Sequence, residues 1–107
     1  MYEVDTVFQA LSNRRRRSAI CCLSEHRRVT LADLAEYVVE SEGEETREIP
    51  ADQTTEVYFS LYHTHVPSLE DAGLVRYNQE RDLVMSTERL QPLIVRARDE
   101  MATLLAV

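Results

Sequence analysis

The segment DAGLVRYNQERDLVMS, residues 71–86, constrains the fold of this chain more than any other. Glycine suits the left-handed residue that ends many helices, and Gly73 is one of only 2 glycines in 107 residues. Directly after it, the runs LVRY and LVMS flank the polar turn NQERD, a pattern typical of two short strands joined by a turn. The sequence therefore predicts a helix that ends at Gly73 and a β-hairpin that follows it.

Three further helices are predicted ahead of this unit. Apolar residues of VDTVFQAL recur at helical spacing over residues 4–11. Ser12 or Asn13 can cap a second helix that contains RRRRSAICCL, because both side chains accept hydrogen bonds from backbone N–H groups. The capping-box pattern TLAD, from Thr30 to Asp33, opens a third helix, and the preceding RRVT is predicted to be extended.

The helix that ends at Gly73 is predicted to begin near Asp52 and to have one apolar side. Its predicted inward stripe consists of Tyr58, Tyr62, Val66 and Leu69. Pro67 has no backbone N–H, and its ring clashes with the carbonyl four residues earlier, so we expect a kink or break there. Ser68 and Asp71 have the spacing of a fresh capping box after that break.

The segment ESEGEETREIPADQ, residues 40–53, separates this helix from the one before it. It carries six acidic residues against one arginine, and it contains glycine and proline. Because it shows no apolar periodicity, it is predicted to be a solvated acidic loop.

The C-terminal segment, residues 87–107, is predicted to be a helix whose apolar positions step by 4, 3, 4 and 3 residues, as in a coiled coil. We call these positions the seam: Leu90, Ile94, Ala97, Met101 and Leu104. The seam is predicted to join two copies of the chain as a homodimer, or alternatively to pack on its own domain. The predicted organisation is a domain at residues 1–86 followed by a dimerisation helix at 87–107.

The predicted fold class is mainly α with a small β-hairpin (α+β). The order of the predicted elements is helix, helix, short strand, helix, helix, hairpin and helix, which is the order of a winged helix-turn-helix. In that fold the helix before the hairpin enters the major groove of DNA and the hairpin forms the wing. The element order therefore predicts a winged helix-turn-helix with a C-terminal dimerisation helix.

The motif YHTHVPSLEDAGLVRY resembles the end of the recognition helix and the start of the wing in ArsR- and PadR-like repressors, whose pattern is roughly S-x-H-L-x-x-L-x-x-A-G-L-V. The residues on that pattern are His65, Val66, Leu69, Ala72, Gly73, Leu74 and Val75. LSNRRRR and LYxTHxPxLxDAG together resemble the small winged-helix DNA-binding proteins of haloarchaea. The resemblance covers about residues 5–86 and implies a sequence-specific DNA-binding transcriptional regulator.

The charge composition also resembles that of haloarchaeal cytoplasmic proteins. All 12 basic residues are arginine, against 19 acidic residues, and the net charge is −7. At about 1 M salt the Debye length is near 3 Å, so an acidic net charge argues only weakly against binding DNA. The sequence has no apolar run of the roughly 20 residues that a membrane span needs, and its N-terminus lacks a signal-peptide pattern. We therefore expect a cytoplasmic protein without a membrane partner.

Candidate DNA-binding residues follow from the predicted helix and hairpin. Outward positions before Pro67 include Phe59 and the polar residues Thr55, Ser60, His63 and Thr64, which suit base edges and phosphates. Arginine is well suited to phosphate. The candidate phosphate contacts are Arg14 and Arg17 in the arginine run and Arg76 and Arg81 in the hairpin. The other two arginines of the run, Arg15 and Arg16, are expected to pair with acidic residues of the chain itself.

Enzymatic, metal and cofactor sites are not expected. No nucleophile has a paired base, no glycine-rich loop could hold a phosphate, and His63 and His65 diverge on a helix; nothing indicates a small-molecule ligand. Of Cys21 and Cys22, at least one is expected in the core. The partners expected are double-stranded DNA and a second copy of the chain. The alternative is a winged helix used for protein–protein contact, favoured if the candidate arginines do not converge beside the His63 helix.

Overall fold

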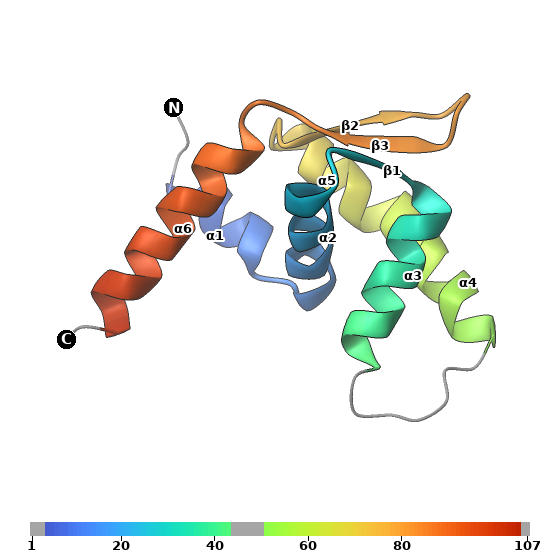
Figure 1. Ribbon diagram of the computed structural model, residues 1–107, viewed down its shortest axis with the longest axis horizontal. Helices are drawn as coiled ribbons and strands as arrows, with labels where there is room; N and C mark the ends of the chain where they lie inside the picture. Colours follow the sequence, from blue (N-terminus) through green and yellow to red (C-terminus); the bar gives the residue numbers. More distant parts are fainter. Residues whose placement is uncertain (1–3, 44–50, 106–107) are drawn as a thin grey trace.

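The computed structural model describes residues 4–43 and 51–105, which form helices on one side of a small sheet (Figure 1). The predicted class, mainly α with a small β part, is confirmed. The elements are α1 (Val4–Leu11), α2 (Arg14–Glu25), β1 (Arg28–Thr30), α3 (Leu31–Glu42), α4 (Ala51–Ser60), the π-helical turn η1 (Leu61–His65), α5 (Val66–Asp71), β2 (Val75–Asn78), β3 (Leu83–Ser86) and α6 (Leu90–Leu105).

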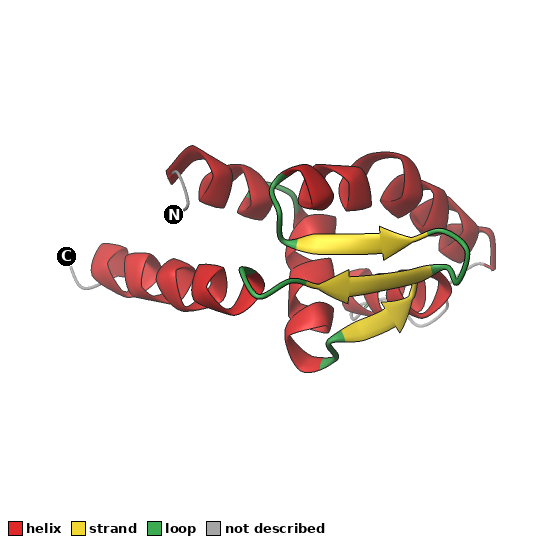
Figure 2. Ribbon diagram, turned by 90° about the horizontal axis from the view of Figure 1, so that it is seen from above, coloured by secondary structure: helices red, strands yellow, loops and turns green. Residues whose placement is uncertain are grey.

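The hairpin predicted from LVRY and LVMS is present, and a third strand joins it. The strand order is β1-β3-β2 with antiparallel pairing throughout, and Figure 2 shows the three strands side by side. Val84 of the central strand is opposite Val29 on one side and Tyr77 on the other. Since Val84 is fully buried, the three residues Val29, Val84 and Tyr77 are on the sheet face toward the helices. Their neighbours along each strand are on the outer face.

Both predicted helix caps are present. The side chain of Asn13, rather than that of Ser12, accepts hydrogen bonds from the backbone N–H groups of Arg15 and Arg16, at 2.8 and 3.2 Å. The hydroxyl of Thr30 accepts from the N–H of Asp33 at 3.1 Å. These contacts satisfy donors that the first turn of a helix leaves free, so both helices begin where the sequence predicted.

The acidic loop predicted at residues 40–53 is shorter than expected. Helix α3 continues through Glu42, and α4 begins at Ala51, one residue before the Asp52 near which its start was predicted. Burial of Val38 and Val39 extends the apolar face of α3 nearly to its end, and an ion pair between Arg15 Nε and Glu42 at 2.7 Å holds the last turn. Residues 44–50 lie outside the described part of the chain.

Pro67 neither breaks nor ends the long helix α4–η1–α5. The chain stays helical from Ala51 to Asp71 because a π turn precedes the proline, with the N–H of Val66 donating to the carbonyl of Leu61 five residues earlier. Pro67 then occupies the first turn of α5, where a missing N–H is tolerated. The predicted capping box is therefore wrong, since Ser68 lies inside α5 rather than at its start.

The π turn also corrects the predicted inward stripe. Val57 and Leu61 are fully buried before the turn, and Val66 and Leu69 are buried after it. Tyr58 and Tyr62 were predicted on the stripe, but they are half-buried and pack against the edge of the core. A π turn contains one residue more than a turn of α-helix. Counting back from Val66 with α-helical spacing therefore gives Tyr62 and Tyr58, each one residue after the residue that is actually buried.

The core lies between the helices and the inner face of the sheet. Its fully buried side chains include Leu23, Leu31, Leu34, Leu61, Leu69, Leu74, Leu90 and Leu93. Leu90 was predicted to be in the dimer interface, but it is 1% exposed in its own chain, so it presents no surface to a partner. The first turn of α6 is thus part of the core.

Of the two adjacent cysteines, Cys22 is buried and Cys21 is exposed, as predicted for a small residue on the inner face of α2. Burial is the main cause that raises the pKa of the Cys22 thiol to about 11. Within the described residues, no helix is both long enough and apolar enough to cross a membrane.

Candidate functional site

The hairpin turn, residues 79–82, lies beside the long helix α4–η1–α5. The hydroxyl of Tyr58 is 3.2 Å from each carboxylate oxygen of Asp82, and the hydroxyl of Tyr77 also donates to Asp82. A second link runs from the side-chain amide of Gln79 to the hydroxyl of Tyr62, at 3.2 Å. Two residues one helical turn apart, Tyr58 and Tyr62, therefore hold the hairpin turn against the middle of the helix.

The backbone of Asp82 fixes the turn to a second helix. Its carbonyl accepts the N–H of Leu31, the first residue of α3, at 2.9 Å. Its φ angle is +51°, a left-handed conformation that aspartate tolerates better than most residues. One residue thus joins the hairpin turn to α3 through its backbone and to α4 through its side chain.

The two tyrosines that contact Asp82 are held in their protonated form. Partial burial is the first cause that raises the pKa of Tyr58 and of Tyr77, and the Asp82 carboxylate adds to it by its charge and its hydrogen bonds. Both phenols therefore stay donors across the neutral range. The carboxylate of Asp82 is turned toward these donors, so its charge is partly balanced at the hairpin turn.

The same helix carries four of the eight residues predicted to contact DNA. Thr55, His63 and Thr64 are exposed and Ser60 is half-buried, so the structure brings these four predicted residues onto one helix. Exposed Phe59 lies among them, and its ring stacks on His63 with centroids 6.0 Å apart and an angle of 15°. The face is therefore polar, with one aromatic residue at its centre.

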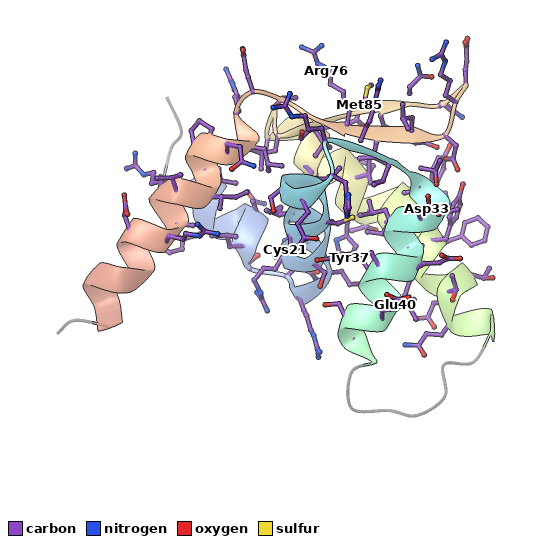
Figure 3. All side chains as sticks on the ribbon, in the orientation of Figure 1. Cys21, Asp33, Tyr37, Glu40, Arg76 and Met85 are labelled. Atoms are coloured by element: carbon purple, nitrogen blue, oxygen red, sulfur yellow. The ribbon has the colours of Figure 1, made fainter. Side chains whose placement is uncertain are left out.

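The four arginines predicted to bind phosphate do not converge. Arg81 is exposed in the hairpin turn, where its N–H donates to the side chain of Asn78 at 3.2 Å. Arg76 and Met85 point away from the helices on the outer face of the sheet (Figure 3). Arg14 and Arg17 lie in the first turn of α2, near the middle of the molecule and away from the hairpin turn (Figure 1). Of the four, Arg81 is the one that belongs to the hairpin turn held against the long helix.

The arginine run is divided between the protein itself and solvent. Arg15 pairs with Glu42, as predicted for an intramolecular contact. Arg16 was expected to pair with an acid, but its guanidinium donates to the carbonyl of Gln9 at 2.9 Å and to the hydroxyl of Ser12 at 3.0 Å. Arg17 is exposed, but its guanidinium also donates to the turn between α1 and α2, to the carbonyl of Leu11 at 2.5 Å. Arg14 is exposed as well, and the phosphate role of Arg14 and Arg17 stays a prediction.

His65 lies on the inward side of the helix and is 6% exposed. Its Nδ1 is 3.5 Å from a guanidinium nitrogen of Arg16. Burial, followed by the positive charge of Arg16, lowers the pKa of His65 below its ordinary value of 6.5. A neutral ring can accept from the guanidinium, so His65 is a structural link between α2 and the long helix. The described residues contain no group of three potential metal ligands.

The described part of α6 contains two half-buried seam residues, Ile94 and Ala97. Figure 2 shows α1 and α6 extending to the same side of the molecule. Each carries an exposed apolar residue, Phe8 at 52% and Val95 at 54%. The side chains of two further seam residues, Met101 and Leu104, lie outside the described part of the chain.

Sequence reasoning missed Asp82 and Tyr77 as organising residues of this surface. The available signals were the aspartate in the turn NQERD and the spacing of Tyr58 and Tyr62, which lie one helical turn apart. Neither signal shows by itself that the two segments meet, because 24 residues separate Tyr58 from Asp82.

Comparison with known proteins gives one family. The family described as "Domain of unknown function (DUF7344)" matches residues 8–85, from within α1 to within β3. No curated protein and no solved structure matches the chain.

Proposed function

The chain belongs to the DUF7344 family, and we propose from its residues and geometry that it is a sequence-specific DNA-binding transcriptional regulator, which acts as a homodimer in the cytoplasm. The proposal has no catalytic step. It assigns the long helix α4–η1–α5 as a recognition helix and the hairpin as a wing.

The observation that carries the proposal is the attachment of the hairpin turn to the long helix. A recognition helix needs the major groove, while a second element beside it contacts the neighbouring phosphates. The contacts of Asp82 with Tyr58 and Leu31 hold the hairpin turn and the two helices as one unit. This unit presents a polar helix face and a cation, Arg81, on adjoining surfaces.

The residues have distinct proposed roles. Ser60 ends α4, and exposed His63 and Thr64 follow it in η1; these three polar side chains are proposed to contact base edges. Thr55 lies closer to the start of the helix, where a hydroxyl suits a phosphate or a base. Arg81 contacts a phosphate beside the groove and adds affinity without sequence preference.

The proposed dimer uses α6 from Ile94 onward. Burial of Leu90 and Leu93 in the core fixes the start of this helix on its own domain, which gives its later turns a defined direction. Apolar residues at Ile94, Ala97, Met101 and Leu104 keep the heptad spacing that pairs helices. Two-fold pairing would present two recognition helices to one duplex.

A protein-docking winged helix is the second candidate function. It is favoured by the position of Arg76, which points away from the helices (Figure 3), and by exposed Glu56, three residues before Phe59 on the long helix. An acidic residue close to a phosphate costs affinity, whereas it can pair with a basic protein surface. The two candidates therefore predict different binding partners for one helix face.

A selection from random duplexes separates the two candidates. The purified chain is incubated with a random duplex pool at several KCl concentrations up to about 1 M, and the bound fraction is amplified and sequenced. Fluorescence anisotropy then compares the enriched duplex with a scrambled duplex of equal length and composition. We expect preference for the enriched duplex of roughly 10³-fold or more. Equal affinity for the two duplexes, or no enrichment, contradicts the proposal and favours protein docking.

A further inference from the structure

Phe59 is an apolar residue in an unexpected place. Its side chain is 52% exposed, whereas the aliphatic residues Val57 and Leu61 of the same helix are fully buried. It lies between polar positions of the outward face, with exposed Glu56 one turn before it and exposed His63 one turn after it. The ring therefore adds nothing to the core that would explain its presence on this face.

Neighbouring rings hold Phe59 in a fixed position. Tyr58 meets it edge-on, with centroids 5.6 Å apart at 87°, and His63 stacks on it at 6.0 Å and 15°. Tyr58 is itself fixed by its hydrogen bonds to Asp82. A ring restrained from two sides loses little further freedom on binding, so Phe59 is a preorganised apolar contact.

The major groove offers such a ring one apolar partner. Guanine, adenine and cytosine present hydrogen-bonding groups at their edges, whereas thymine also presents its C5-methyl group. A phenyl ring cannot hydrogen-bond to the polar edges and would strip water from them at a cost. Contact with the methyl group removes apolar surface of both partners from water, which is favourable.

We propose that Phe59 contacts the C5-methyl group of a thymine, which makes thymine the preferred base at one position of each half-site. This inference rests on the proposed function and adds a specificity residue to it. It also gives His63 a second role, because the imidazole that faces the bases supports the phenyl ring from one side.

Deoxyuridine substitution tests the contact one methyl group at a time. Each thymine of the enriched duplex is replaced in turn by deoxyuridine, which keeps base pairing and removes only the methyl group. With the wild-type chain we expect one position per half-site where the change weakens binding about fourfold, the value of one buried methyl group. With Phe59→Ala the thymine and deoxyuridine duplexes should bind equally at that position.

Phe8 supplies a matched control, because it is a phenylalanine with the same 52% exposure on α1. Phe8→Ala should keep the wild-type discrimination between thymine and deoxyuridine, and Phe59→Leu should keep part of it. Thermal unfolding of each variant shows whether it is folded. The deoxyuridine substitutions measured with the wild-type chain do not depend on the folding of any variant.

The outcomes separate this inference from the proposed function. If an enriched duplex exists but no thymine is sensitive, or if the sensitivity persists in Phe59→Ala, the inference is wrong while sequence-specific binding stands. If no duplex can be enriched, the proposed function fails and the inference fails with it. In that case the exposed ring belongs to a protein-docking surface.

Discussion

The hydroxyl of Tyr58 lies 3.2 Å from both carboxylate oxygens of Asp82, and this contact joins the long helix to the hairpin turn. The same aspartate accepts from Tyr77 and from the backbone of Leu31. Together with the contact between Gln79 and Tyr62, Asp82 therefore fixes the position of Arg81 relative to the helix face. Any function that uses the two together depends on these contacts.

A double-mutant cycle measures this contact. Tyr58→Phe removes the donor, and Asp82→Asn removes the charge while keeping a residue that tolerates positive φ. Because a hydrogen bond to a charged group contributes more than a neutral one, we expect a coupling free energy on the order of 1 kcal/mol between the two changes. Urea unfolding of the four proteins in one salt buffer gives the value. A coupling near zero would show that solvent replaces the contact without cost.

The buried histidine should make stability depend on pH below neutrality. The folded-state pKa of His65 is lowered below 6.5 by burial and by Arg16, so the unfolded chain binds a proton that the folded chain does not. The stabilisation is complete above pH 6.5 and is lost as pH falls through the folded-state value. Urea unfolding between pH 7.5 and about 5 should show this loss in the wild type.

Two substitutions identify the group responsible. His65→Gln should flatten the pH dependence, because it removes the titrating ring from its place beside Arg16. His63→Gln replaces an exposed histidine two residues earlier and should leave the slope unchanged. Equal slopes in the wild type and His65→Gln would assign the acid sensitivity to other groups.

Local sequence signals predicted the caps and the hairpin well. Asn13 and Thr30 cap their helices with bonds to residues two or three positions away, so the contacts are encoded within a few residues. Gly73 has a φ angle of +76°, which explains why glycine ends the helix there. Patterns of this kind can be predicted from a sequence because the interacting residues are only a few positions apart in the chain.

Contacts between distant segments could not be predicted in the same way. Pro67 predicted some departure from the α-helix, but not the π turn that precedes it and leaves both Leu61 and Leu69 buried. The partners of Arg16 are set by the path of the α1–α2 turn, and Asp82 meets Tyr58 across 24 residues of sequence. The helix face was thus predicted from the sequence, whereas the attachment of the hairpin to it was not.

The hairpin turn should contribute affinity rather than specificity. Arg81→Ala removes the cation nearest the recognition helix, so it should weaken binding to enriched and scrambled duplexes by similar factors. The slope of log affinity against log salt should become shallower by about one unit. Arg98→Ala, which removes an exposed arginine of α6, is the charge-matched control and should change the slope less. A selective loss on the enriched duplex would instead assign Arg81 to base reading.

The dimer can be tested by two substitutions in one helix. Ala97→Glu places a charge on the predicted seam, and Val95→Glu places one at a neighbouring position that is 54% exposed. We expect light scattering at high salt to give a dimer for the wild type and Val95→Glu, and a monomer for Ala97→Glu. A monomeric wild type, or equal dissociation by both changes, would show that α6 does not pair through this seam.

The most direct test of DNA reading by the recognition helix is the affinity ratio between an enriched and a scrambled duplex, measured for the wild type and for His63→Ala. His63 is exposed and is proposed to contact base edges, so its loss should cost about 1–3 kcal/mol on the enriched duplex and little on the scrambled one. The ratio should therefore fall by roughly 5- to 150-fold. An unchanged ratio, with both affinities intact or both reduced alike, would contradict the assignment of this helix as the element that reads DNA.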